Sequence, residues 1–506
     1  MNKTMHLLRP TVAAAIAMAA ATVSAGEVPA DTLLSRVSEH HSPERAITGM
    51  PYDNPALRPF NRSWSYSTAA IGWEYDMAQK PVAMQSGRGY NGWMFDADSY
   101  MKLGRSTVWG RAYYRNGRRH DILWNETSDA DRLYPYLTAD AAGGDMNREE
   151  YHFSGGYSCP GRNLSWGVSA GYTAELEYRR VDPRPRNVTS RLEARGGIAI
   201  RILPGYMAGV SGLLEKYKQT CSIRFVSELG SIKIYHLTGL GTDYSRFAGN
   251  GTSSYYNGWA YGGTVNLYPV SSRGFMASIE ARRFSFDKIL SDLNRLPLVH
   301  ATETSLKAQA AWRSQRLTIA ADGCLTARHG TENIFGDASS SAYPQIGSLP
   351  QYNRHTASAA VYGVWRQPAG VASLTVMPVF RYDSDIEKYS HPSGKIATTT
   401  IQPSINCGAD IRAGRRTLLE IGCGWSLRSP LTATMALPDP SSAASAPALN
   451  DFIYRQGSSR EISLSAAATS AITSRYALRL SVAASDTRYP TGVHRREARA
   501  SIAMIF

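Results

Sequence analysis

Charged and apolar residues alternate along this chain with a period of two. In the stretch from Val188 to Arg201, apolar or small residues occupy the even positions, whereas Arg191, Glu193 and Arg195 occupy odd ones. This spacing places the two sets on opposite faces of a β-strand. A row of charges is prohibitive against lipid but costs little against water. The pattern therefore predicts a strand with one face on lipid and the other on water.

The same alternation recurs at 166–179, 275–282 and 306–313, and short turns alternate with long connections. Eight short, turn-like connections, six of which contain Gly or Pro, fall at 103–105, 159–163, 203–205, 271–274, 313–315, 367–370, 414–416 and 471–474. These residues supply the backbone angles that turns need. The long connections are 116–148, 217–255, 328–354 and 430–459, and the run 221–240 falls in an outer loop. We therefore predict an all-β, transmembrane antiparallel β-barrel of about 18 strands (16–20 tolerable), with short periplasmic turns and long extracellular loops.

Both ends of the chain carry export features. Residues 1–25 combine two basic residues, a short apolar run and small residues before a cut, which is typical of a secretory signal peptide. At the other end Ile502, Met504 and Phe506 share one face of a final strand. A strand that ends on Phe resembles the C-terminal insertion signal of bacterial outer-membrane barrels, and this resemblance implies the outer membrane and its barrel-insertion machinery.

We expect three parts: the signal peptide 1–25, a periplasmic segment or small plug at 26–62, and the barrel at 63–506. Asp31 is expected to cap a short helix through Leu33, Leu34 and Val37. The triplet Asn54-Pro55-Ala56 resembles the Asn-Pro-Ala near the N-terminus of long-chain fatty-acid transporter-type barrels, and nothing else in the chain matches that family.

The formal net charge of +14 comes from arginines scattered along strands. Nucleic-acid binding needs basic residues gathered in one patch, so this scatter argues against a nucleic-acid partner. It fits a charged lumen, or a rim that meets anionic lipopolysaccharide and outer-membrane lipid.

Fourteen charged residues fall on predicted lumen-facing positions, and their excess of arginine predicts a mild anion preference. Paired arginines and glutamates can equally brace a plugged lumen. The candidates are Glu175, Glu177, Arg191, Glu193, Arg195, Arg201, Glu280, Arg282, Arg313, Arg381, Asp410, Glu420, Arg479 and Arg499.

No complete catalytic, cofactor or metal motif is present. His152 and Ser154 share the predicted lumen face, but acyl transfer also needs an orienting partner and an oxyanion site. The acids at 383, 385 and 387 have calcium-binding chemistry, although solvated loop charges explain them as well. His40 and His41 lack companion ligands and are interpreted as surface residues. We predict no enzyme activity, no cofactor and no metal.

Cys407 and Cys423 fall opposite each other if 405–413 pairs with 417–425 around the turn 414–416. Opposed residues lie within ~4.5–5.5 Å, near enough for a bridge. The favoured alternative is a pair of small lipid-facing cysteines that stay free.

The signal peptide, the series of hairpins and the terminal Met504-Ile505-Phe506 together make residues 64–506 resemble the uncharacterised outer-membrane β-barrel families of Bacteroidota-type bacteria. That resemblance implies a barrel and a location but no site residues. The leading hypothesis is a passive channel or transporter for small polar or amphipathic solutes. The alternatives are a plugged scaffold that binds surface lipoproteins or receptors through exposed loops, and an outer-membrane hydrolase, for which no site is evident.

Overall fold

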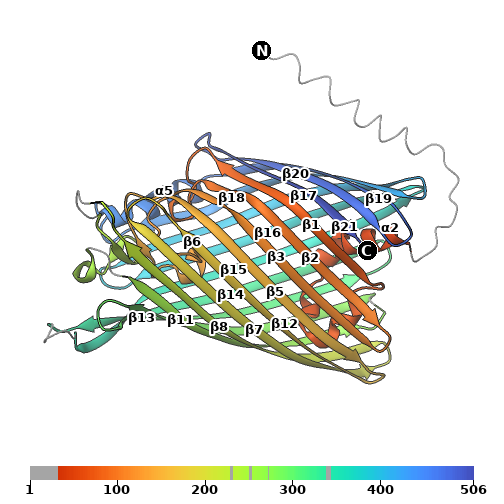
Figure 1. Ribbon diagram of the computed structural model, residues 1–506, viewed down its shortest axis with the longest axis horizontal. Helices are drawn as coiled ribbons and strands as arrows, with labels where there is room; N and C mark the ends of the chain where they lie inside the picture. Colours follow the sequence, from red (N-terminus) through yellow and green to blue (C-terminus); the bar gives the residue numbers. More distant parts are fainter. Residues whose placement is uncertain (1–31, 228–231, 250–252, 272, 338–342) are drawn as a thin grey trace, which may run out of the picture.

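A closed β-barrel dominates the computed structural model, which describes residues 32–227, 232–249, 253–271, 273–337 and 343–506 (Figure 1). Among these residues eighteen strands pair antiparallel in one sheet. The sheet closes because β1 (Tyr66–Ala78) pairs with both β2 (Gly89–Leu103) and β21 (His494–Ile505). The predicted fold class and strand number are confirmed. The predicted signal peptide lies outside the described residues.

The remaining barrel strands follow one another in chain order around the wall. They are β3 (Ser106–Ile122), β5 (Gly144–Pro160), β6 (Leu164–Tyr178), β7 (Arg184–Leu203), β8 (Tyr206–Arg224), β11 (Ser254–Pro269), β12 (Gly274–Leu290), β13 (Leu296–Arg313), β14 (Leu317–Phe335), β15 (Gln345–Ala369), β16 (Ala372–Tyr389), β17 (Gly394–Ala413), β18 (Thr417–Ala436), β19 (Ser459–Ala471) and β20 (Ala477–Arg488).

All eight predicted short turns connect neighbouring strands at one end of the barrel, where β1 begins and β21 ends. At this seam the amide of Ser67 donates to Phe506 O, and the amide of Phe506 donates to Ser67 O, each at 3.0 Å. The predicted pairing of β17 with β18 is confirmed, because Cys407 lies opposite Cys423. Both cysteines are free and exposed.

The outer face of the barrel is apolar over its middle. Leu192, Leu214, Val265 and Ile279 are 53–63% exposed. An apolar surface this large aggregates in water but is stable against lipid. Residues one position away on the same strands, such as Glu215 and Glu280, are buried inside. The alternation therefore sorts lipid-facing from lumen-facing side chains as the sequence pattern predicted.

Short helices precede the first strand: α2 (Leu33–His40), α3 (Pro43–Ile47), and the 3-10 turns η1 (Met50–Asp53) and η2 (Pro55–Phe60). The predicted helix through Leu33 and Val37 is present, but Thr32 caps it, and its hydroxyl accepts from the amide of Ser35 at 3.2 Å. The other helical elements are α4 (Ala130–Leu133), α5 (Ala446–Arg455), η3 (Met84–Ser86), η4 (Ser245–Phe247) and η5 (Ala443–Ser445). No helix in the described ranges is long and apolar enough to cross a membrane.

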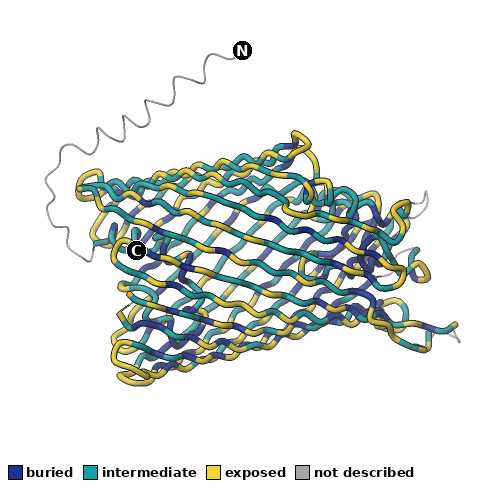
Figure 2. The backbone as a smooth tube through the Cα atoms, turned by 180° about the vertical axis from the view of Figure 1, so that it is seen from behind, coloured by how far each residue is buried: buried dark blue, intermediate teal, exposed yellow. Residues whose placement is uncertain are grey.

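The long connections pack together at the other end, and the expectation that they are exposed is wrong for three of them. They are the loop β3–β5 (residues 123–143), the loop β8–β11 (residues 225–253) and the loop β18–β19 (residues 437–458). The first two form a small sheet from β4 (Thr138–Ala139), β9 (Tyr235–Gly239) and β10 (Thr242–Asp243). Buried backbone gathers inside this end of the barrel (Figure 2).

Candidate functional site: a charged lumen closed at both ends

The N-terminal segment, Thr32–Arg62, lies inside the turn-bearing end of the barrel (Figure 1). Its η2 turn contacts the inner faces of β5, β6, β7 and β8. Tyr52, Ala56 and Leu57 are at most 4% exposed and pack with Tyr268 and Met276 of the wall. The segment therefore fills part of the lumen at this end of the barrel.

Three inward-facing glycines form a seat for this segment. A Cβ on Gly197 would lie 2.1 Å from Asn54 Oδ1, and one on Gly209 would lie 2.8 Å from Asn54 Nδ2. A Cβ on Gly167 would lie 2.6 Å from the carbonyl oxygen of Pro55. No side chain fits at these distances, so the wall is reduced to glycine where Asn54 and Pro55 dock.

Hydrogen bonds hold the segment in its seat. Asn54 Nδ2 donates to Asn266 Oδ1 at 3.1 Å, and the hydroxyls of Tyr52 and Tyr268 lie 3.0 Å apart. Further bonds run from Ser165 Oγ to Ala56 O (2.6 Å), from Tyr100 OH to Arg58 O (3.0 Å) and from Met50 N to Gln309 Oε1 (3.1 Å). The contact combines a small apolar cluster with many polar bonds.

His40 fixes the start of the segment against β1. Its ring stacks on Tyr66 with centroids 4.1 Å apart and an angle of 17°. Burial, followed by the positive charge of Arg62, lowers the pKa of His40 to about 2. His40 is therefore neutral at physiological pH. The interpretation of this pair as surface residues holds for His41, which is exposed, and is wrong for His40.

The predicted lumen-lining residues lie on the inner face of the barrel, and most of them form ion pairs. Arg195 contacts Glu193 at 2.8 Å and Glu280 at 3.2 Å. The other paired members are Glu175 with Arg148 (2.9 Å), Glu177 with Arg119 (3.1 Å), Arg282 with Glu215 (2.9 Å), Asp410 with Arg366 (2.6 Å), Glu420 with Arg479, and Arg499 with Glu74 (3.5 Å).

Four of the candidates form no ion pair with a described residue. Arg381 donates to Tyr362 OH at 3.4 Å, and Arg191 contacts Thr173 Oγ1 at the same distance. Arg313 lines a cavity at the inner end, and Arg201 is exposed at the inner rim.

An outer closure fills the loop-bearing end of the barrel. Trp124, Leu133, Tyr136 and Leu137 of the loop β3–β5 are at most 6% exposed. They pack with Leu237, Leu240 and Phe247 of the loop β8–β11, with Ala444 of the loop β18–β19, and with barrel side chains that include Tyr217, Tyr256, Phe284 and Tyr352. This aromatic cluster has the size and burial of a domain core.

A buried ion triad anchors the loop β3–β5. Arg179 Nη2 lies 2.9 Å from Glu126 Oε1 and 2.6 Å from Asp140 Oδ2, and none of the three side chains is more than 2% exposed. Burial and the hydrogen bond shared with Asp140 raise the pKa of Glu126 well above its usual value. Burial opposes ionisation of Asp140 too, but the bonds from Glu126 and Arg179 lower its pKa. Protonation of the triad is therefore favoured on Glu126 rather than on Asp140.

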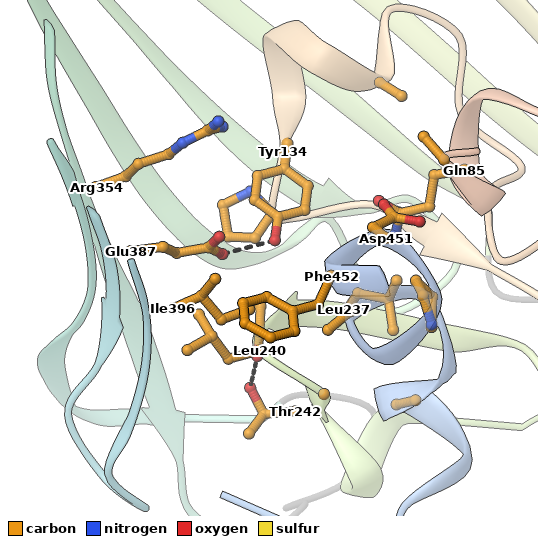
Figure 3. Close-up of a pocket in the computed structure, with 18 of the residues that line it drawn as sticks. Gln85, Tyr134, Leu237, Leu240, Thr242, Arg354, Glu387, Ile396, Asp451 and Phe452 are labelled. Carbon is orange, nitrogen blue, oxygen red and sulfur yellow. Dashed lines mark hydrogen bonds between the residues drawn. The ribbon is translucent and has the colours of Figure 1, made fainter. Parts of the chain in front are cut away.

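Beside this closure lies an outer pocket of about 250 Å³ (Figure 3). Tyr134 OH donates to Glu387 Oε1 at 2.6 Å, while Phe452 and Leu240 supply apolar walls. The acids 383, 385 and 387 were candidates for calcium. Asp385 instead receives a bidentate bond from Arg354, with both distances 2.8 Å. The described residues contain no group of three potential metal ligands.

Further cavities lie along the lumen, and three of them have linings from the barrel wall. An outer chamber of about 520 Å³ and a central chamber of about 390 Å³ share Arg191 in their linings. An inner chamber of about 500 Å³ lies between the N-terminal segment and the short turns. Six arginines and four acids line the outer chamber, four arginines and three acids the central one, and seven arginines or lysines and two acids the inner one. Each chamber therefore carries an excess of positive charge.

His152 and Ser154 line the central chamber. His152 Nε2 lies 3.0 Å from Ser154 Oγ, and Nδ1 lies 2.9 Å from Thr173 Oγ1. The third group is thus a hydroxyl, whereas a catalytic triad uses a carboxylate to orient the histidine. This arrangement supplies hydrogen bonds to the chamber and lacks the acid of a hydrolase.

Sequence reasoning missed the glycine seat and the Arg179 triad. One available signal was the occurrence of Gly167, Gly197 and Gly209 on lumen-facing positions, where large or polar side chains otherwise prevail. No sequence signal pairs Arg179 with Glu126 and Asp140.

A family model described as a family of unknown function (DUF6850) matches residues 55–506. Similar solved structures include the ferric preacinetobactin receptor BauA from Acinetobacter baumannii, with 9% identity, a TM-score of 0.42, and coverage of 88% of this chain and 80% of that chain. The ferric enterobactin receptor PfeA from Pseudomonas aeruginosa has 8% identity, a TM-score of 0.40, and coverage of 88% and 81%. These values are too low to transfer a ligand or an activity. The search of curated proteins finds no match.

Proposed function

The chain belongs to the DUF6850 family, whose function is unknown, and we propose that it is an outer-membrane transport protein for small polar or amphipathic solutes whose lumen is gated. The outer-membrane location is supported by the closed barrel with an apolar outer face, since barrels of this kind span that membrane. The proposal adds a gate to the passive channel that was the leading hypothesis from the sequence.

One observation carries the proposal: charged chambers follow one another along the lumen, and the N-terminal segment interrupts them. A barrel that served only as a scaffold would gain stability from a filled, fully paired interior. Here Arg191, Arg313 and Arg201 face the lumen without a carboxylate partner among the described residues, which suits a passing solute better than a braced core.

The N-terminal segment has the properties of a gate. Within the described residues it is connected in sequence to the barrel through β1 alone, so it can leave its seat without breaking a strand pair. Many of its contacts to the wall are hydrogen bonds between a side chain and the backbone. Water replaces such bonds at a net cost of about 1 kcal/mol each, so each of these bonds opposes undocking only weakly.

Planar-bilayer conductance tests this function. We expect the full chain to show rare, brief openings. A variant lacking residues 32–62, in which the outer closure still limits flow, should open more often and conduct more when open. Circular dichroism checks that the variant retains β-structure, and Gly197→Ala, which disturbs the seat without removing residues, provides a second route to opening. A folded deletion variant that stays silent would overturn the proposal.

The second candidate, a plugged scaffold, is favoured by the outer closure, whose buried aromatic core resembles a permanent structure. Silence of the folded deletion variant would support it. Surface lipoproteins or receptors would then bind the remaining exposed loops.

We propose lipopolysaccharide as a contact of the outer face. Lys218 of β8 and Arg283 of β12 are exposed there on the two strands that flank β11, and Lys216 Nζ lies 4.2 Å from the centre of the Trp259 ring. Basic and aromatic residues at this level suit phosphate-bearing headgroups. The barrel-insertion machinery remains the expected assembly partner.

A further inference from the structure

The central chamber combines the N-terminal segment with the barrel wall. Tyr52, Asp53 and Arg58 face it from the segment, and strands β2, β3, β5, β6 and β7 supply the rest of its lining. A ligand in this chamber would therefore contact the gate and the wall together.

Two guanidinium groups face this chamber without an ion pair to any described residue. Arg58 lies over the Trp109 ring at 5.7 Å, and its Nη1 has only a long contact, 3.5 Å, to Tyr52 O. Its Nε is buried and has no hydrogen-bond partner in the described structure. Arg191 has one contact, 3.4 Å to Thr173 Oγ1. Buried or half-buried charged donors are normally paired, so both lack the acceptor that such positions require.

Two acids of the chamber are already paired. Glu193 pairs with Arg195 at 2.8 Å, and Asp98 pairs with Arg62 at 3.5 Å. Arg111, also in the lining, is held by Asp96 at 2.6 Å. Asp53 forms no ion pair with a described residue and is influenced by Arg195 and, more weakly, by Arg58. The unpaired charges of the lining are therefore Arg58, Arg191 and one carboxylate, which leaves an excess of one positive charge.

Neutral donors lie beside these two arginines. The chain from Thr173 through His152 to Ser154 places two hydroxyls and an imidazole on the chamber wall. A hydroxyl can donate to an anion while it accepts from a neighbour. Arginine adds planar, bidentate recognition of carboxylate and phosphate oxygens.

We propose that the central chamber is a binding site for the anionic group, phosphate or carboxylate, of a small solute, held between Arg58 of the N-terminal segment and Arg191 of β7. The inference rests on the proposed transport function and names its substrate class. Arg191 also lines the outer chamber, so the anion reaches it first from outside and Arg58 second.

Isothermal titration of the full chain in detergent at low ionic strength, with inorganic phosphate and with acetate as separate probes, tests this site. We expect saturable binding of at least one probe. Arg58→Gln and Arg191→Gln should each weaken it at least tenfold, because each removes one charge-assisted bond. Arg191→Lys, which keeps the charge, should lose less.

Arg186→Gln is the matched control, because Arg186 is exposed on the lipid-facing side of the same strand. Equal weakening in Arg186→Gln, no change in either central-chamber variant, or no binding of either probe to folded protein would each overturn the site. The conductance of the deletion variant does not require this site. If neither probe binds at this site but the deletion variant conducts, only the inference is refuted. If the folded deletion variant does not conduct, the transport function is refuted.

Discussion

Replacing Gly197 with alanine should undock the N-terminal segment while leaving the barrel intact. The new Cβ would lie 2.1 Å from Asn54 Oδ1 and 3.0 Å from Ser211 Cβ. Backbone on the β7 side is fixed by pairing to β6 and β8, so Asn54 has to move.

Two hydrogen bonds of Asn54 set the magnitude of the expected loss in docking free energy. Its Nδ2 bonds Asn266 Oδ1 at 3.1 Å, and its Oδ1 accepts from Ala56 N at 3.0 Å. Both asparagines are at most 2% exposed. Losing a buried bond and leaving its partner unsatisfied costs roughly 1–3 kcal/mol. We expect docking to weaken by ~2–3 kcal/mol, which raises the undocked population about 30- to 160-fold.

Hydrogen exchange measured by mass spectrometry on residues 50–60 reports this population, because Ala56 N and Leu57 N both bond to Asn54. Gly196→Ala is the control: its Cβ meets nothing within 4 Å, and it has the same effect on the unfolded chain. Equal protection of residues 50–60 in the two variants would show that the glycine seat does not hold the segment.

Three further perturbations follow from the same structure. Arg179→Met leaves Glu126 and Asp140 buried without their cation and should destabilise the loop β3–β5 by about 3–5 kcal/mol. Proteinase K should therefore cleave faster within residues 123–143. The control variant Arg180→Met, changed at an exposed neighbour, should be cleaved at the wild-type rate, and equal rates in the two variants would contradict the anchoring role. The pKa of His40 falls from 6.5 to about 2 on docking, so its contribution to docking stability is present above pH 6.5 and is lost as the pH falls below it. Hydrogen exchange of residues 33–41, corrected for intrinsic rates, should therefore rise from pH 7 to pH 5. If the same pH dependence persists in His40→Phe, this histidine is excluded as the cause. In the variant lacking residues 32–62, Arg195→Glu places a third carboxylate beside Glu193 and Glu280 and should shift the ion preference toward cations. Arg186→Glu should leave the preference unchanged. An unchanged reversal potential in the Arg195→Glu variant would refute the charged pathway.

The regular wall was predictable from the sequence because its period of two is local. Val188 to Arg201 showed both faces of β7, and the turn 414–416 alone fixed Cys407 opposite Cys423. Strand ends were less accurate, and the first strand begins at Tyr66 where the pattern indicated residue 64. Ladder hydrogen bonds continue past the point where the apolar alternation stops, so composition does not mark the ends.

The closures were not predictable, because their contacts join irregular segments far apart in the chain. Asn54 meets Gly197 and Asn266, and no local pattern records either contact. The loop β3–β5 carries acids that suggest solvent exposure, yet Glu126 and Asp140 are fully buried on Arg179. From the sequence alone, a charged residue that is buried in an ion pair cannot be distinguished from a charged residue on the surface.

The two closures differ in how they are attached, and this difference sets their kinetics. Each loop of the outer closure is tethered at both ends and shares one aromatic core with the other loops. Its opening is therefore cooperative and belongs with slow sub-global unfolding events. Within the described residues, the N-terminal segment is connected to the barrel wall through β1 alone, so we expect its release to be faster. We therefore expect the two closures to open at different rates. The slower one, the outer closure, would then govern how long a solute stays in the lumen.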